Sequence, residues 1–366
     1  MPRLSKKPDR PPDSILEKLV GKIDDRLGGG SAGDTVPTGF ASLDRLLAGG
    51  LRRRDLVVLA GDVGSGKSAL ALGIAIRVAS AGKPTLYFSG EMSPERVMER
   101  ALALEARVSV DDLRQGRLDD VARAAVGAAA VRLRGAPLLV KPLLGADFAE
   151  VSDALDIVPR RQLLIVDSLQ LTTPPRSAAR LEERVALAVR ALKALALARD
   201  LAVLVIAQLP HLQSSRPDPR PTLDDLGALG AIKQSADVIL TIYREEMYRP
   251  PQGVEGATEL ILAKNRNGPT GFVDLYFYPR WLRFVDTRVQ WSDASTFLFY
   301  RSHGTIAIEH DTVGDAQPGS IDVADQPCRR CQLHFFFGDH VAFDLAANHD
   351  HLAGYFRPNF RAFTDG

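Results

Sequence analysis

This sequence of 366 residues has few cysteines, few long apolar runs and almost no excess of charge of either sign. Two cysteines, Cys328 and Cys331, are too few for a disulfide scaffold, which excludes the small secreted proteins that depend on one. The apolar-rich stretch from Val185 to Ala198 contains Arg190 and Lys193, so it predicts an amphipathic helix and no membrane span. The basic start is followed by prolines and acids, without the apolar core of a signal peptide. We therefore expect a cytoplasmic protein without a membrane partner.

Charge and composition leave the binding partner open. The net charge is +1, and a ring-shaped protein can present a basic channel while its outer face stays acidic. Hydrophobic residues make up 45% of the chain and charged residues 25%, the ordinary composition of a soluble globular protein. The length permits one large domain with smaller appendages.

The chain divides into three segments by pattern. Residues 1–35 contain a basic start that is expected to be disordered, an amphipathic arm helix from Ser14 to Leu27, and a glycine-rich linker. The arm carries one apolar stripe, formed by Ile15, Leu16, Leu19, Val20, Ile23 and Leu27. Residues 36–286 form the main domain, and residues 287–366 differ in character and are assigned to a C-terminal extension of unknown role.

Short apolar segments alternate with helical patterns through the main domain. The expected strands are Asp55 to Ala60, Pro84 to Ser89, Pro137 to Lys141, Gln162 to Asp167, Ala202 to Gln208 and Val238 to Tyr243. Such alternation predicts an α/β fold with a mostly parallel central sheet flanked by helices. Two further stretches, Thr258 to Lys264 and Gly271 to Phe284, predict hairpin-like strands at one edge of the sheet.

A complete P-loop pattern follows the first expected strand and precedes a helix. Its residues are Gly61, Asp62, Val63, Gly64, Ser65, Gly66, Lys67 and Ser68. Backbone N–H groups of such a loop hold phosphates, while Lys67 would reach the β- and γ-phosphate oxygens and Ser68 would ligate Mg²⁺. The pattern predicts ATP and Mg²⁺ as ligands.

Three polar residues end other apolar strands. Asp167 follows Leu163 to Val166, and beside a P-loop it is expected to be the acid on the metal side of the site. Glu91 and Gln208 end two more strands, and the carboxyl ends of parallel strands gather at one edge of the sheet. Glu91 could orient the attacking water and Gln208 could sense the γ-phosphate; the alternative is that both are solvated loop residues.

The region from Val36 to Asp286 resembles the C-terminal motor domain of the DnaB family of replicative helicases, which has a RecA-like P-loop NTPase fold. The resemblance covers about two thirds of the chain. It is carried by Pro37 to Phe40 with Leu43 and Asp44, the P-loop, Ser89 to Ser93, Leu113 to Gly116, Asp167 to Leu171, Gln208 and Leu209, Asp225 and Leu226, Gly230, Ile232, Gln234, Ala236 and Asp237, and Lys264 to Gly271.

The resemblance implies roles for the matched residues. Glu91 is expected to be the catalytic base, Asp167 the acid of the Mg²⁺ site, and Gln208 the sensor that couples the nucleotide to the DNA loops. Lys264 and Arg266 are expected to reach the ATP site of the neighbouring subunit. The resemblance further implies a ring, most simply a hexamer, that moves 5′ to 3′ along single-stranded DNA in replication.

This sequence departs from the family pattern in three places. Only residues 1–35 precede the motor, where the family has a large collar domain, so contact with a primase or loader is doubtful. Polar and basic positions of the DNA-loop segment are Gly227, Ala228 and Leu229 here, so loop backbone N–H groups, Lys233, Arg216 or Arg220 would have to contact DNA. Ser168 replaces the aromatic residue that commonly follows the strand-end acid.

Two alternatives to a helicase remain at this point: a RadA-like or KaiC-like ATPase that acts as a recombination mediator or regulatory assembly, and a non-motor DNA-binding partner in mixed rings. The intact set of Lys67, Glu91, Asp167 and Arg266 argues against the second. In the C-terminal extension, Cys328 and Cys331 either form half of a zinc site with nearby histidines or are free thiols. These histidines are His334, His340, His349 and His351.

Overall fold

The computed structural model describes most of the main domain and five shorter pieces outside it. The described residues are 13–27, 33–143, 148–157, 160–171, 181–209, 216–250 and 253–287, with short strands at 300–302, 305–307, 331–335 and 343–347.

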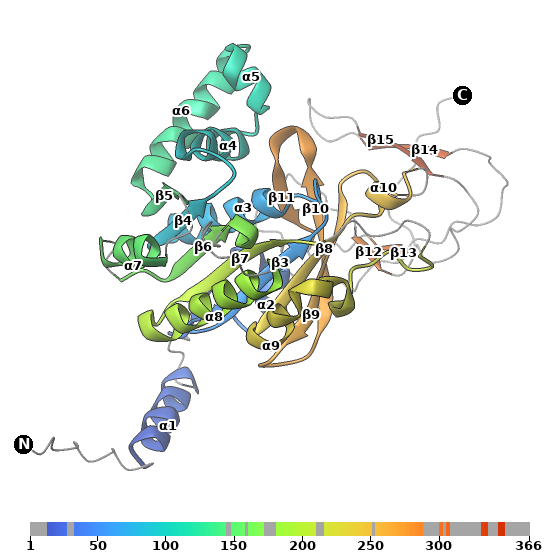
Figure 1. Ribbon diagram of the computed structural model, residues 1–366. Helices are drawn as coiled ribbons and strands as arrows, with labels where there is room; N and C mark the ends of the chain where they lie inside the picture. The colour runs from blue at the N-terminus through green and yellow to red at the C-terminus, as the bar shows by residue number, and fades with distance from the viewer. Residues whose placement is uncertain are drawn as a thin grey trace, which may run out of the picture.

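A nine-stranded sheet forms the centre of the main domain, in the order β11-β10-β9-β8-β3-β7-β6-β4-β5 (Figure 1). The six strands from β8 to β5 in this order are parallel, and β9, β10 and β11 are antiparallel. The bounds are β3 Leu56–Gly61, β4 Thr85–Ser89, β5 Leu138–Pro142, β6 Leu163–Asp167, β7 Ala202–Gln208, β8 Val238–Tyr243, β9 Ala257–Asn265, β10 Gly271–Tyr278 and β11 Arg283–Asp286. The predicted α/β class is confirmed, and the six expected parallel strands end within one residue of their predicted ends.

Helices cover both faces of the sheet, which explains why its central strands are apolar at nearly every position. One face carries α2 (Ala41–Leu46), α3 (Lys67–Ser80), α4 (Pro94–Ala106) and α6 (Asp120–Gly135), and the other carries α7 (Phe148–Ile157), α8 (Leu181–Arg199) and α9 (Gly230–Ser235). In β3, Val57 and Leu59 pack on the α3 side, whereas Val58 and Ala60 pack on the α8 side. All are at most 1% exposed. β3 therefore contributes side chains to both apolar cores, one on each face of the sheet.

Shorter elements join these strands and helices. They are β1 (Thr35–Val36), which pairs with β2 (Leu51–Arg52), the helices α5 (Val110–Gln115) and α10 (Glu245–Tyr248), and the 3₁₀ turns η1 (Leu169–Leu171), η2 (Leu223–Leu229) and η3 (Pro279–Trp281).

The edge of the sheet differs from the prediction in one respect. The sequence predicts a single extended stretch over Gly271 to Phe284, but η3 divides it into β10 and β11. Pro279 lacks an N–H group for a strand ladder, and Leu282 has a left-handed φ of 51°. The chain therefore turns back, and β11 pairs antiparallel with β10.

Two regions outside the main domain contain described elements. α1 (Asp13–Leu27) lies at the position predicted for the arm helix and is one residue longer at its start. The C-terminal extension contains two antiparallel pairs, β12 (Tyr300–Ser302) with β13 (Thr305–Ala307) and β14 (Cys331–Phe335) with β15 (Phe343–Ala347). None of the helices described is long and apolar enough to span a membrane. The expected cytoplasmic location stays a prediction.

Candidate nucleotide-binding site

The P-loop connects the carboxyl end of β3 to the first turn of α3. Gly64 and Gly66 have φ values of 77° and 96°, which a residue with a Cβ atom rarely adopts. These glycines bend the chain over the start of α3, where the N–H groups have no helical partner and the helix dipole favours an anion. The conformation is suited to binding phosphate groups.

Gly66 is required for space as well as for conformation. A Cβ atom built on Gly66 lies 2.8 Å from Cζ of Phe284, a buried residue of β11. We expect Gly66→Ala to lower the free energy of unfolding by about 1–2 kcal/mol from left-handed strain and about 1–3 kcal/mol from overpacking, and to abolish ATP binding.

Gly82→Ala is the matched control for this substitution. Gly82 has a φ of 74°, but a Cβ atom there has no neighbour within 4 Å. This control should lose only the strain contribution in thermal unfolding and should bind ATP normally. Equal effects of the two variants on both measurements would contradict the role of Phe284.

Lys67, Ser68 and Asp167 meet at the carboxyl edge of the sheet. The Lys67 amine donates to the carbonyl of Asp62 (2.6 Å), and burial lowers the pKa of Lys67 although nearby carboxylates oppose this. Burial also raises the pKa of Asp167, which is 1% exposed, while hydrogen bonds from Tyr87 and Ser68 act in the opposite direction. The cation and the strand-end acid thus share one partly dehydrated region.

The strands β4 and β7 flank β6; Glu91 lies two residues after the end of β4, and Gln208 is the last residue of β7. Ser89 of β4 is paired with Asp167, and the Ser168 hydroxyl lies 3.5 Å from Oε1 of Glu91. Gln208 of β7 is paired with Gly61 of β3, which is the first residue of the P-loop. Both Glu91 and Gln208 are exposed. The structure therefore places these side chains beside the P-loop, as expected for strands that end at one edge.

Three residues that sequence reasoning missed support the P-loop or the acid. Arg244, at the end of β8, donates to the carbonyl of Gly64 (3.3 Å), lies over the ring of Phe277 and is ion-paired with Glu246. The hydroxyls of two tyrosines contact acids of the site: that of Tyr248 is 3.5 Å from Oδ2 of Asp62, and that of Tyr87 is 2.7 Å from Oδ2 of Asp167. No local pattern marked these three residues, because the P-loop residue or acid that each one contacts is distant in sequence.

The chemistry of these groups fits a magnesium–nucleotide complex. Mg²⁺ prefers oxygen ligands, and the hydroxyl of Ser68 and the carboxylate of Asp167 are hydrogen-bonded to each other at the start of α3. The Lys67 amine and the N–H groups of the first turn of α3 supply positive charge for phosphates. Ser68 and Asp167 would hold the metal.

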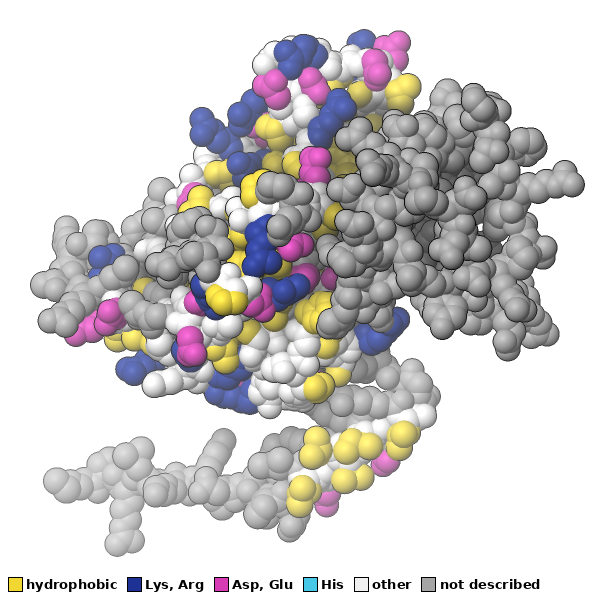
Figure 2. Space-filling model, turned by 90° about the vertical axis from the view of Figure 1, so that its right-hand side faces the viewer, with side chains coloured by type: hydrophobic (Ala, Val, Ile, Leu, Met, Phe, Trp, Pro, Cys, Tyr) yellow, Lys and Arg dark blue, Asp and Glu magenta, His cyan; other side chains and the backbone are white. Residues whose placement is uncertain are grey.

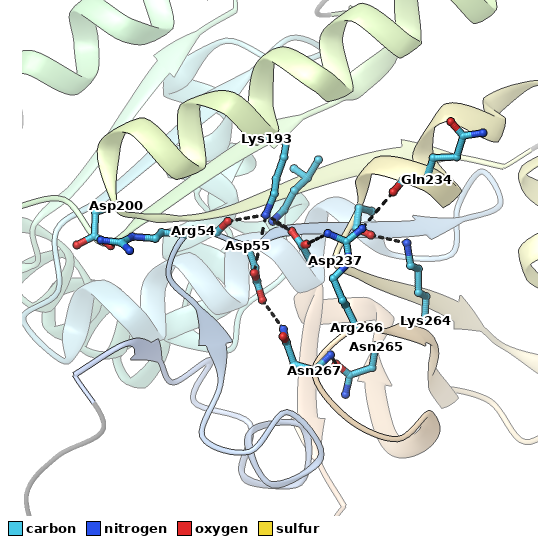
Figure 3. A network of polar contacts seen from close by, with 12 residues as sticks. Arg54, Asp55, Lys193, Asp200, Gln234, Asp237, Lys264, Asn265, Arg266 and Asn267 are labelled. Carbon is cyan, nitrogen blue, oxygen red and sulfur yellow. Dashed lines mark hydrogen bonds and ion pairs between the residues drawn. The ribbon is translucent and has the colours of Figure 1, made fainter. Parts of the chain in front are cut away.

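Lys264 and Arg266 lie at the opposite edge of the sheet from the P-loop, where the parallel strands β3 and β8 begin. They belong to the polar network drawn in Figure 3. Arg266 donates to Oδ1 of Asp237 (2.8 Å) and to the carbonyl of Gln234 (3.2 Å). The Lys264 amine donates to the carbonyls of Lys233 (2.5 Å) and Ala236 (2.6 Å), at the end of α9. Both cations thus neutralise the carbonyl end of a short helix.

Asp237 is the centre of this network. Its carboxylate is 2% exposed and also accepts from the Lys193 amine (2.5 Å) and the backbone N–H of Leu56 (2.8 Å), the first residue of β3. Because β3 has six residues, Arg266 is separated from the P-loop by about 17 Å of strand at roughly 3.3 Å per residue. Arg266 is half exposed and cannot reach the P-loop of its own chain.

The three cations expected to replace missing DNA contacts are all ion-paired. Arg216 contacts Asp225 (2.7 Å), Arg220 contacts Glu259 (2.6 Å) and Lys233 contacts Asp224 (2.8 Å). Exposed pairs of this kind contribute little, on the order of 0–1 kcal/mol, so a phosphate can compete for these cations. Gly227 to Leu229 lie in η2, which directly precedes α9.

The zinc hypothesis falls largely outside the part of the chain that the structure describes. Cys328, His340, His349 and His351 lie outside it, and Cys331 and His334 are placed only as members of β14. Among the residues that are described, no group of three or more His, Cys, Asp or Glu side chains could hold a metal ion.

Comparisons with known proteins agree with this arrangement. The profile of the family described as DnaB-like helicase C terminal domain matches residues 35–286. The replicative DNA helicase DnaB of Leifsonia xyli subsp. xyli is 34% identical over 255 residues, which are 69% of this chain and 56% of that protein. The chain thus spans less than two thirds of the curated relatives that it matches.

Two solved structures have the same architecture. One is an isolated ATPase domain, which superposes with a TM-score of 0.69 at 25% identity, covering 76% of this chain and 99% of that domain. A DnaB-like replicative helicase, described with its interactions with primase, also has a TM-score of 0.69 and 25% identity, covering 75% of this chain and 68% of that one.

Proposed function

This chain belongs to the DnaB-like helicase C-terminal domain family, and on that premise we propose that it is an ATP-dependent DNA helicase or translocase. It would act on single-stranded DNA as a ring-shaped oligomer in replication. The observation that carries the proposal is the position of the polar groups: P-loop, Asp167, Glu91 and Gln208 are at one edge of the sheet, and Arg266 is at the other.

At the P-loop edge, each side chain has a task that suits its position. Lys67 and the N–H groups of the loop bind the phosphates, and Ser68 and Asp167 orient the metal. Mg²⁺, when bound, neutralises charge that develops on the transferred phosphoryl group. Glu91 orients the attacking water and accepts its proton. Gln208, beside Gly61 in the register, responds to the γ-phosphate.

At the other edge, Arg266 and Lys264 are proposed to complete the ATP site of a neighbouring copy. A guanidinium supplied by another subunit stabilises the charge of a loose phosphoryl transition state. Because donor and acceptor surfaces lie on opposite edges of one domain, successive copies pack through unlike surfaces, which generates a ring when the rotation closes. We propose a hexamer for this ring. The primase contact described for the solved relative is not included in this proposal.

A forked-duplex assay tests the function directly. Purified protein with ATP should unwind a fork with a 5′ single-stranded tail, and should fail without ATP or with only a 3′ tail. ATP turnover stimulated by single-stranded DNA without any strand separation would favour a translocase or the alternative of a recombination mediator. The relatives, which are replicative helicases, do not favour that alternative.

The arm helix α1 gives a test of assembly. The apolar side chains that the structure describes on α1 are exposed, from 45% for Ile23 to 82% for Leu27. Figure 2 shows apolar side chains gathered along α1, below the main domain. Such a stripe is unfavourable in water and matches a groove on another subunit. Deleting residues 1–30 should lower the oligomer size in light scattering and reduce ATP turnover.

Substitutions on the two faces of α1 provide the controls for this deletion. Leu19→Asp combined with Ile23→Asp should reproduce the deletion, because both side chains lie on the exposed apolar stripe. Glu17→Gln, outside the apolar stripe, should leave assembly unchanged. Full-size rings with normal turnover after the deletion would show that the main domains alone hold the assembly together.

A further inference from the structure

Tyr87 is a buried polar residue for which the roles above leave no function. It lies in the middle of β4, is 0% exposed, and donates its hydroxyl proton to Oδ2 of Asp167 at 2.7 Å. In the register, Tyr87 is paired with Ile165, two residues before Asp167 on β6. Side chains two residues apart share a face of the sheet, so the phenol extends along that face to the acid.

The hydrogen bond determines how the Asp167 carboxylate is oriented. The terminal torsion of an aspartate has broad, weak preferences, so its neighbours set the direction of the two oxygens. Tyr87 approaches Asp167 from the neighbouring strand, and Ser68 bonds the same carboxylate from the start of α3. The acid is thus held between the sheet and the helix that carries the P-loop.

The Tyr87 ring is packed in the core on the α3 side of the sheet, and its hydroxyl is hydrogen-bonded to Asp167. A small cavity lies beside the ring and is lined by side chains that include Ser68, Leu72 and Met92. A buried hydroxyl without a partner is costly, and Asp167 supplies that partner. Removal of the hydroxyl would leave the ring in its apolar core while the carboxylate loses one of its two restraints.

We propose that Tyr87 is a positioning residue for the magnesium–nucleotide complex: its hydroxyl holds Asp167 so that the Asp167 carboxylate faces Ser68 and the P-loop. The inference rests on the proposed function, because it takes Asp167 as the acid of the metal site. It does not require unwinding, DNA or a neighbouring subunit.

Tyr87→Phe tests the proposal, since it deletes only the hydroxyl. ADP affinity of the full-length chain is measured with MgCl₂ and with EDTA. In wild type, Mg²⁺ should tighten ADP binding. In Tyr87→Phe, affinity in EDTA should match wild type, and affinity with Mg²⁺ should fall by about tenfold, the expected loss for one hydrogen bond to a charged group. Manganese binding in the presence of ADP, followed by electron paramagnetic resonance, should weaken in parallel.

Tyr278→Phe is the matched control. Tyr278 is on β10, and its ring stacks on Trp281. This variant should keep the full effect of Mg²⁺. An equal loss of ADP affinity with and without Mg²⁺ in Tyr87→Phe would show that Tyr87 supports only the fold, and an unchanged Mg²⁺ effect would overturn its positioning role. Failure of the helicase proposal is seen separately, in the unwinding assay on the wild-type chain.

Discussion

Replacing Glu91 with glutamine should lower ATP turnover by about 10²- to 10⁴-fold while ATP affinity stays close to that of wild type. Binding depends on the P-loop and on Lys67, which the substitution leaves in place. Glutamine keeps the size of the side chain but cannot accept the proton of the attacking water at neutral pH. Glu91 is exposed and lies two residues after the end of β4, so the change should not affect the fold. Turnover and nucleotide affinity, measured on the same preparation, test this expectation.

Lys67→Ala is the complementary variant. It removes the amine that neutralises the β- and γ-phosphates, so both ATP binding and turnover should be lost. The pair of variants therefore separates binding from chemistry. If Glu91→Gln lost ATP affinity to the same extent as Lys67→Ala, Glu91 would be part of the binding surface and the base would have to be sought elsewhere.

Replacing Arg266 with alanine should reduce turnover by about 10³- to 10⁵-fold, the range measured for arginines supplied from another subunit. The chain should remain folded, because Asp237 keeps Lys193 and the N–H of Leu56 as partners. Arg123→Ala, which removes a charge from the exposed side of α6, serves as the control and should be active.

A mixture of two inactive variants tests whether Arg266 acts on a neighbour. Arg266→Ala chains contribute intact P-loops, and Lys67→Ala chains contribute intact Arg266 side chains. In a random equimolar ring, about one quarter of the interfaces then combine both intact parts, and turnover should reappear. No recovery in mixed rings of normal size would place the action of Arg266 within its own chain.

Five of the six parallel strands could be predicted because each is buried on both faces and is therefore apolar at almost every position. The sixth, the edge strand β5, is only partly buried and was predicted from the apolar residues Leu138 to Val140. The order of the strands could not be predicted, because β3 lies between β7 and β8, which are distant in sequence. The break between β10 and β11 was missed for a local reason. Pro279 and the left-handed Leu282 end an apolar run that otherwise has the pattern of one strand.

The P-loop edge could be predicted because its residues meet backbone or chemical demands that leave a pattern. Gly64 and Gly66 report left-handed conformations, and Asp167 is a charge at the end of an apolar strand. Tyr87 and Arg244 leave no such pattern, since a tyrosine in a strand is typical of a core and Arg244 contacts the P-loop at Gly64, 180 residues away. Likewise, Lys264 and Arg266 were identified from the resemblance to a family, but the resemblance did not reveal that Asp237 binds Arg266.

The placement of the P-loop and Arg266 on opposite edges of one sheet determines how many complete ATP sites an assembly contains. In an open row of copies, the copy at one end has a P-loop that no neighbour completes, and the copy at the other end has an Arg266 without a site. Closing the row joins these two ends and creates one more complete site without adding a chain. Under the proposed arrangement, turnover per chain therefore rises when the ring shuts around its strand, and the gain is largest for the smallest assemblies.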